Sequence, residues 1–219
     1  MPTKTLNIKI CGMKNQSTIE LCESLKVDYL GFNLIKESPR FINADEFEKL
    51  VACVNYCLPV LVFKYTDISE FKNVIHHPKV QALQVYFDKE IATQEVITSL
   101  NQLKQSTGKK IIFPTSVLSG FEDLKEINAE VDYFLFDTTD EKLLGGTGKI
   151  FDWKLLNSIA GDTTLKPFFV AGGLNPENIE ELLKVCSPYA VDVASGVEKD
   201  GVKDPKKIKQ FVLKICTKN

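Results

Sequence analysis

Two short segments carry side chains that can exchange a proton with a small molecule. Lys9 and Cys11 alternate with Ile8 and Ile10, so an extended chain places the ammonium and the thiol on one face. A neighbouring positive charge favours the thiolate, the form in which cysteine acts as a base; an inert core cysteine is the alternative. Asp137 follows an apolar run, where a carboxyl group serves either as a cap or as a proton carrier with a raised pKa.

Glycine clusters and one arginine indicate an anionic ligand. The segments Gly145-Gly146-Thr147-Gly148, Gly172-Gly173 and Ser195-Gly196 each follow an apolar run. Glycine lets backbone N–H groups approach a ligand closely, and such groups bind phosphate. Tight turns without a ligand are the alternative interpretation. Arg40, directly after Ser38-Pro39, can bind a carboxylate with its planar guanidinium or pair with a surface acid.

The elements that must position these residues are short apolar segments that recur along the chain. They predict eight strands, at residues 6–11, 28–34, 58–64, 80–86, 110–114, 132–137, 167–171 and 189–194. Several are continuous apolar runs, which is typical of parallel strands covered on both faces. Amphipathic segments lie between them, so the chain repeats a strand–helix unit of about 27 residues.

Polar residues indicate where several of the intervening helices begin. Four pairs of a polar cap and a later acid have capping-box spacing: Ser17 with Glu20, Asn43 with Glu46, Asp67 with Glu70, and Ser119 with Glu122. Asn175-Pro176 and Asp204-Pro205 place proline at the first helical position, where its missing N–H costs little.

Eight such units in 219 residues predict an α/β protein, a single-domain (β/α)8 TIM barrel over residues 1–219. A doubly wound open sheet is the alternative, but its G-x-G-x-x-G fingerprint is absent after the first strand, where Cys11-Gly12-Met13 stand. In a barrel, functional residues lie at the carboxyl ends of the strands. We therefore expect Cys11, Arg40, Asp137 and the glycine clusters to meet at one end of the barrel.

Composition narrows the class of function. The formal net charge is −2, from 27 basic and 29 acidic residues. The chain therefore lacks the basic excess that would suggest nucleic acid as a partner. No apolar run approaches the ~20 residues that span a membrane, and residues 1–4 lack the apolar core of a secretory signal. The six cysteines therefore predict reduced thiols in a cytoplasmic protein. No His or Cys cluster has the spacing of a metal site, and we expect no metal.

Taken together, the motifs resemble phosphoribosylanthranilate isomerase, a family of tryptophan biosynthesis. The resemblance rests on Lys9-Ile10-Cys11-Gly12, Ser38-Pro39-Arg40, Asp137 with Gly145-Gly146-Thr147-Gly148 and Phe151-Asp152-Trp153, Ala171-Gly172-Gly173-Leu174-Asn175-Pro176, and Ser195-Gly196-Val197-Glu198 with Gly201 and Lys203-Asp204. It implies an isomerase that needs no cofactor. Such an enzyme converts N-(5-phospho-β-D-ribosyl)anthranilate to 1-(2-carboxyphenylamino)-1-deoxyribulose 5-phosphate by an Amadori rearrangement, the third step of tryptophan synthesis from chorismate.

The resemblance also implies a role for each matching residue. Asp137 matches the acid that protonates the ribose ring oxygen, Cys11 the base that removes the proton from ribose C2, and Arg40 the group that holds the anthranilate carboxylate. Cys11 and Asp137 are thus the predicted catalytic residues. The predicted substrate-binding residues are Lys9, Arg40, Gln84, Gly146, Gly148, Gly172, Gly173, Asp192, Ser195 and Gly196. The expected partner is the small phosphosugar-anthranilate, and the expected oligomeric state is a monomer or homodimer.

The third and fourth strands depart from the family pattern. The usual Val-Phe-Val-Asn and Gln-Leu-His-Gly segments read Val62-Phe63-Lys64-Tyr65 and Gln84-Val85-Tyr86-Phe87 here, and Ala194 replaces the first serine of Ser-Ser-Gly. Tyr86 and Phe87 are candidates for an aromatic surface that holds the anthranilate ring.

Two alternative functions remain. The first is the histidine-pathway isomerase that catalyses the same rearrangement. That family uses aspartates on strands one and five, where this chain has Cys11 and Pro114-Thr115. The second is a catalytically silent protein that binds a phosphate-bearing ligand.

Overall fold

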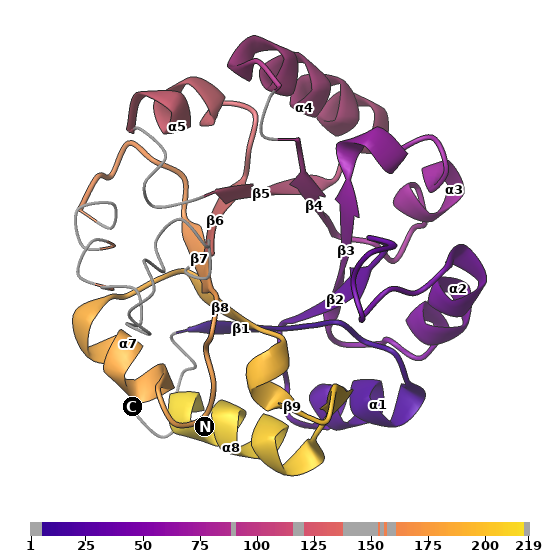
Figure 1. Ribbon diagram of the computed structural model, residues 1–219, viewed down its shortest axis with the longest axis vertical. Coiled ribbons are helices and arrows are strands. Elements are labelled where there is room, and N and C mark those ends of the chain that lie inside the picture. Colours follow the sequence, from indigo (N-terminus) through magenta and orange to yellow (C-terminus); the bar gives the residue numbers. More distant parts are fainter. Residues whose placement is uncertain are drawn as a thin grey trace.

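The computed structural model describes residues 6–88, 91–115, 121–137, 153, 156 and 161–216. Eight parallel strands close into a barrel in chain order, with the helices arranged around the outside (Figure 1). The strands are β1 (Asn7–Cys11), β2 (Tyr29–Asn33), β3 (Leu58–Lys64), β4 (Ala82–Tyr86), β5 (Lys110–Thr115), β6 (Tyr133–Asp137), β7 (Phe168–Ala171) and β8 (Ala190–Val193). Each strand begins and ends within two residues of its predicted range. The predicted fold class is confirmed.

In the described part of the chain, helices lie between most successive strands. The described helices are α1 (Gln16–Ser24), α2 (Ala44–Ala52), α3 (Lys72–Ile75), α4 (Thr93–Thr107), α5 (Phe121–Ile127), α7 (Ile179–Val185) and α8 (Pro205–Cys216), with short 3-10 helices η1 (Tyr65–Asp67) and η2 (Ser195–Val197). A small antiparallel pair, β9 (Glu198–Lys199) and β10 (Val202–Lys203), follows η2. None of these described helices has the length and apolar character that a bilayer crossing requires.

Two of the predicted helix starts are confirmed. Asn43 accepts from the Glu46 backbone N–H and the Glu46 side chain accepts from the Asn43 N–H, which is a complete capping box at α2. Pro205 is the first residue of α8, and the Asp204 carboxylate accepts from the backbone N–H of Lys206 at 2.8 Å. Both helices begin where the side chain satisfies otherwise unpaired N–H groups.

Three other starts were wrong. Asn15, not Ser17, caps α1, because its side chain reaches the backbone N–H of Thr18 at 2.9 Å. Asp67 ends η1 instead, where N–H groups bond three residues back and the tight turn does not continue. Asn175 accepts from two following N–H groups, but Pro176 lies in a turn and α7 starts only at Ile179.

The predicted start at Ser119 lies outside the described residues, as do the loop glycines 145, 146 and 148. The connection from β6 to β7 is described only at Trp153, Leu156 and from residue 161 onward.

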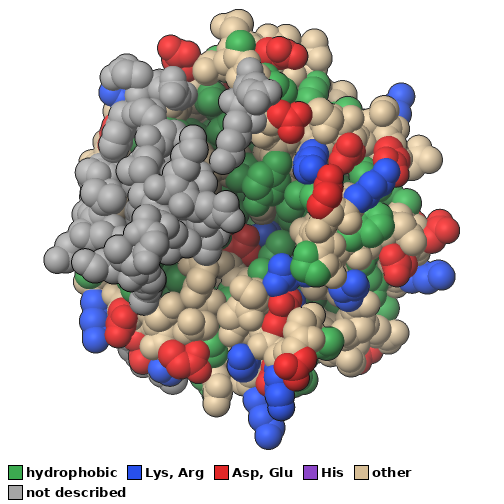
Figure 2. Space-filling model, viewed as in Figure 1, with side chains coloured by type: hydrophobic (Ala, Val, Ile, Leu, Met, Phe, Trp, Pro, Cys, Tyr) green, Lys and Arg blue, Asp and Glu red, His purple; other side chains and the backbone are tan. Residues whose placement is uncertain are grey.

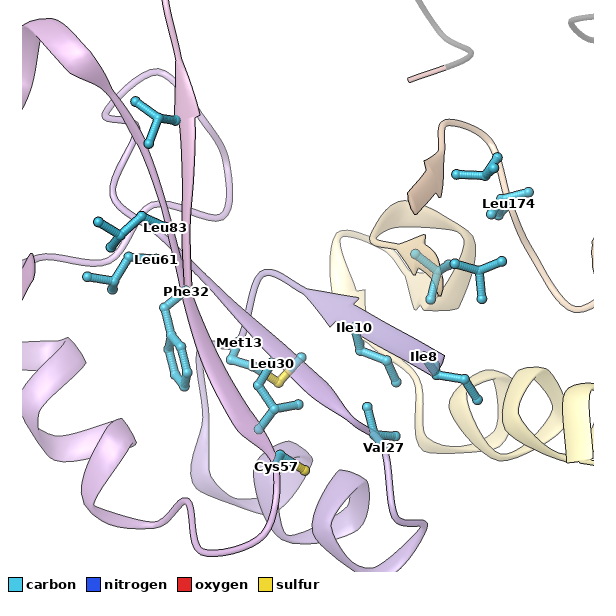
Figure 3. Close-up of a cluster of buried hydrophobic side chains, with 14 of the residues drawn as sticks. Ile8, Ile10, Met13, Val27, Leu30, Phe32, Cys57, Leu61, Leu83 and Leu174 are labelled. Atoms are coloured by element: carbon cyan, nitrogen blue, oxygen red, sulfur yellow. The ribbon is translucent and has the colours of Figure 1, made fainter. Parts of the chain in front are cut away.

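Side chains alternate along the strands between the helix layer and the barrel interior. Ile8 and Ile10 face the helices, where they pack beside Leu30 in the outer hydrophobic core (Figure 3). Tyr29, Phe169 and Ala190 belong to a separate buried cluster that fills the barrel interior. Because this cluster occupies the interior toward the amino ends of the strands, the opposite end is left for polar side chains.

Candidate active site

A cavity of about 250 Å³ lies at the carboxyl ends of the strands. Figure 2 looks along the barrel axis and shows acidic and basic side chains at the bottom of the central hollow. Eight predicted site residues line the cavity: Cys11, Arg40, Gln84, Asp137, Gly172, Gly173, Asp192 and Ser195. Lys9 lies below it, Gly196 lies beside Ser195, and Gly146 and Gly148 fall outside the described residues. Most of the predicted site residues thus lie together at one end of the barrel, as expected.

Lys9 is fully buried in the barrel interior. Its ammonium donates to the Gln84 side-chain oxygen at 2.8 Å and to an Asp192 carboxylate oxygen at 2.6 Å. Burial disfavours the charged ammonium, but the carboxylate of Asp192 is the main group that outweighs this effect, and the pKa of Lys9 is raised. Lys9 is therefore a charged residue that supports the cavity floor, and it is not among the residues that line the cavity.

Cys11 ends β1 with its side chain at the cavity, on the same face as Lys9. Burial raises the pKa of the Cys11 thiol above its ordinary 9.0, and the positive charge of Lys9 only partly opposes this. Lys9 does lower this pKa, as expected, but it does not outweigh burial, so the expectation of a favoured thiolate was wrong. The main physical reason is burial of the thiol, and the charge of Asp192, which pairs with Lys9, adds to the rise.

Gly31 makes room for this thiol. It pairs in register with Cys11 across the β1–β2 ladder. A Cβ atom at Gly31 would lie 2.6 Å from the Cys11 sulfur, well inside van der Waals contact. The sequence did hold a signal, because a glycine in a strand interior marks a close approach, but the prediction overlooked it.

Asp137 ends β6 and lines the same cavity as Cys11. Leu135, two residues earlier on the same strand, lines the cavity too, and so does Tyr86 at the end of β4. When ionised, the carboxyl group of Asp137 contributes to the raised pKa of the Tyr86 hydroxyl, after the larger effect of burial. Phe87, the other candidate for an aromatic surface, instead stacks on Tyr65 with ring centroids 4.9 Å apart.

Arg40 borders the cavity with its guanidinium already paired. Its Nε and Nη2 donate to the two carboxylate oxygens of Glu198 at 2.8 and 2.6 Å. Lys203 donates to the same carboxylate at 2.6 Å. Glu198 thus occupies the edge of the guanidinium that was predicted to bind a substrate carboxylate. Among the described contacts, Nη1 is the guanidinium nitrogen that has no partner. Glu198 belonged to a recognised motif, but no local signal linked it to Arg40.

The loops after β7 and β8 bring backbone groups close together. Gly172 and Gly173 have φ angles of +90° and +63°, the left-handed region that glycine adopts without strain. A side chain at Gly196 would overlap the Leu174 carbonyl oxygen, so the two loops touch at this point. Ser195 begins η2, and the first N–H groups of a helix have no partner within it. Gly172, Gly173 and Ser195 line the cavity, and backbone N–H groups of such turns are suited to binding an oxyanion.

The closed barrel, with a thiol, a carboxyl group and two glycine turns around one cavity at its carboxyl end, defines the class of (β/α)8-barrel enzymes. The family model for N-(5'-phosphoribosyl)anthranilate (PRA) isomerase matches residues 8–214. The chain belongs to this family.

Individual relatives agree with this assignment. The chain is 37% identical over 211 residues to N-(5'-phosphoribosyl)anthranilate isomerase of Clostridium acetobutylicum, covering 96% of this chain and 98% of the relative. Among solved structures, the isomerase of Pyrococcus furiosus is 29% identical with a TM-score of 0.74, covering 96% and 98% of the two chains. Another phosphoribosylanthranilate isomerase, solved with reduced 1-(o-carboxyphenylamino)-1-deoxyribulose 5-phosphate, is 24% identical with a TM-score of 0.76, over the same shares of the two chains.

Proposed function

We propose that the protein isomerises N-(5-phospho-β-D-ribosyl)anthranilate to 1-(2-carboxyphenylamino)-1-deoxyribulose 5-phosphate in tryptophan biosynthesis. One observation carries the proposal: in a chain of this family, Cys11 and Asp137 line a single cavity beside the two glycine turns. A general acid, a general base and an anion site are what a phosphorylated sugar needs for this rearrangement. The reaction moves protons within one molecule, so no atoms are gained or lost.

Asp137 acts first, as the general acid. Its carboxyl group gives a proton to the ribose ring oxygen, the C1–O bond breaks, and the anthranilate nitrogen forms a Schiff base with C1. Asp137 stands at the carboxyl end of β6, on a different wall of the cavity from Cys11 on β1. The two groups therefore reach the sugar from different sides.

Cys11 then removes the proton from ribose C2. In the ligand-free protein the raised pKa keeps this side chain as a thiol at neutral pH. The Schiff base is a cation when protonated, and a positive charge near a thiol favours the thiolate. Proton removal from C2 gives an enolamine, which becomes the ketone when C1 is protonated and the C2 hydroxyl gives up its proton.

The polar groups around the cavity fix the substrate. The backbone groups of the Gly172-Gly173 turn and of Ser195 hold the phosphate. Asp192 keeps one buried carboxylate oxygen without a hydrogen-bond partner in the described residues, so this oxygen accepts from a substrate hydroxyl. Arg40 contributes positive charge near the anthranilate carboxylate while Glu198 holds its guanidinium in place.

Two substitutions test the assignment of the acid and the base. Cys11→Ala and Asp137→Asn each lower turnover by about 10²-fold or more, because each removes one proton-transfer group. Turnover is followed by the loss of fluorescence of the phosphoribosylanthranilate. The matched controls are Cys53→Ala, at the end of α2, and Asp45→Asn, on the exposed face of α2. Near-normal turnover in either site variant removes that residue from the mechanism.

Growth of a tryptophan auxotroph that lacks this step tests the function as a whole. Rescue by the wild-type gene supports the isomerase. Binding of the substrate without turnover or rescue would instead identify a silent ligand-binding protein.

We also propose that the enzyme works in the cytoplasm as a monomer or homodimer. All six cysteines are free, which suits a reducing compartment. Sedimentation velocity of the purified protein distinguishes the two oligomeric states.

A further inference from the structure

A chain of hydrogen-bonded polar side chains crosses the barrel at the floor of the cavity. It starts at Asp192 on β8, passes through Lys9 on β1 and Gln84 on β4, and ends at Tyr86, also on β4. Figure 1 shows that β1 and β4 lie on different sides of the barrel, so the long lysine side chain spans its interior. The three links measure 2.6, 2.8 and 3.0 Å.

The chemistry of the lysine sets the direction of every link. An ammonium group only donates, so the Gln84 oxygen must face Lys9. The Gln84 amide nitrogen then faces Tyr86 and donates to its hydroxyl oxygen. Tyr86 acts as an acceptor in this bond, and its own O–H group is left to donate elsewhere. Within the described part of the chain, Gln84 is the hydrogen-bond partner recorded for this hydroxyl.

Both ends of the chain open into the cavity. Tyr86 and Asp192 line it, whereas Lys9 lies beneath. At the Asp192 end, Oδ1 is buried and has no hydrogen-bond partner among the described residues. The chain therefore presents one acceptor and one donor to whatever fills the cavity. Hydroxyl groups of a sugar can satisfy both, since each donates once and accepts as well.

We propose that Tyr86 is a substrate-binding residue that donates a hydrogen bond to a hydroxyl oxygen of the ribose. This rests on the proposed function. The phosphate is the less suitable acceptor, because the glycine turns follow β7 and β8 while Tyr86 ends β4. Among the described residues that line the cavity, Arg40 is the one cation that could compete with Tyr86 for the sugar.

The tyrosine keeps this donor over the working pH range. Burial is the main cause that raises the pKa of its hydroxyl above the ordinary 10.0, so the group stays protonated at neutral pH. The position is also one where this chain departs from the usual Gln-Leu-His-Gly segment. Tyrosine can accept from Gln84 and donate to a ligand at the same time, as a neutral histidine ring also can.

Tyr86→Phe removes the donor and keeps the ring. We expect the Kd for reduced 1-(o-carboxyphenylamino)-1-deoxyribulose 5-phosphate, measured by calorimetry, to rise about 3- to 10-fold, as for the loss of one hydrogen bond. The inhibition constant of inorganic phosphate stays within about twofold, because phosphate binds at the glycine turns. In turnover, KM rises more than kcat falls, because the bond forms in the ground state as well as the transition state. Tyr86→His restores most of the affinity.

Three results would overturn the proposal: unchanged affinity of Tyr86→Phe for the reduced product, an equal loss of affinity for phosphate, or no recovery in Tyr86→His. Circular dichroism and thermal unfolding establish that each variant is folded before binding is compared. The same measurements on the wild-type protein separate a wrong role for Tyr86 from a failure of the proposed function. Wild-type protein that neither binds the reduced product nor turns over the substrate would refute the isomerase itself, and with it the role of Tyr86.

Discussion

Replacing Gly31 with alanine tests how closely β2 must approach the Cys11 thiol. Gly31 pairs with Cys11 across the β1–β2 ladder, and its α-carbon faces the side chain of Cys11. An added Cβ would lie 2.6 Å from the sulfur, 2.9 Å from the Cys11 α-carbon and 3.1 Å from its Cβ. The second of these contacts is with backbone, so rotation of the thiol alone cannot relieve the overlap.

The magnitude follows from the size of the overlap. Carbon and sulfur atoms in contact normally lie at least ~3.5 Å apart, so the thiol and β1 must move by about 1 Å. A misplacement of ~1 Å at a reacting group costs about 10²-fold in rate. Inserting a methyl group into a packed core also lowers the free energy of unfolding by about 1–3 kcal/mol. We expect Gly31→Ala to lose about 10²-fold in kcat, with less change in KM.

Fluorescence-based turnover and urea unfolding are measured on Gly31→Ala and on a matched control, Gly108→Ala. Gly108 ends α4 with φ +66° and has no atom within 4 Å of an added Cβ. Alanine there costs about 1–2 kcal/mol of stability through backbone strain, without touching the cavity. If both variants lose activity to the same extent, or if Gly31→Ala keeps near-normal kcat, the steric reasoning is wrong.

Two further predictions concern charge. Because burial raises the pKa of Cys11 above 9.0, its alkylation by iodoacetamide in the ligand-free protein, followed by mass spectrometry, should still accelerate beyond pH 9; a plateau below pH 8 contradicts this. Glu198→Gln leaves Lys203 buried without its counter-ion and lowers the free energy of unfolding by about 3 kcal/mol at pH 7. Burial alone would raise the pKa of Glu198, but Arg40 and Lys203 together lower it below 4.5. The stability that the ionised Glu198 contributes is therefore lost as the pH falls through this lowered pKa. Urea unfolding at pH 7 and pH 3 should therefore show the difference between wild type and Glu198→Gln shrinking in acid, and an equal difference at both pH values contradicts the ion-pair account.

The contacts of Arg40 limit how it can take part in the proposed binding of substrate. Glu198 occupies the planar side of the guanidinium and is itself held by Lys203 and by the β9–β10 pair. Gly12 is needed here as well, because a side chain at Gly12 would collide with the Arg40 side chain. The arginine is thus held in place by the protein itself, and the remaining guanidinium nitrogen and its charge are what is left for the proposed contact with the anthranilate carboxylate.

The sequence alone determined the barrel and the residues at its carboxyl end. Strands such as Leu58–Lys64 are continuous apolar runs, and caps such as Asn43 with Glu46 act within one helical turn, so short-range patterns carry this information. In a parallel barrel the carboxyl ends of all strands meet, which places Cys11 and Asp137 at one cavity without knowledge of any contact. The helix starts predicted at Ser17 and Asp67 were wrong because a side chain or a tight turn a few residues away satisfies the local N–H groups instead.

Only the tertiary structure decided the electrostatics of the site. Lys9 bonds to Asp192 across 183 residues of sequence and Arg40 to Glu198 across 158, and neither pairing has a local signal. The pKa of Cys11 is a balance between burial and charges on other strands, so the sequence placed Lys9 beside the thiol but could not give the sign of the net shift. The physical reason is that strand patterns arise from neighbours along the chain, whereas burial and ion pairing depend on which distant strands the closed barrel brings together.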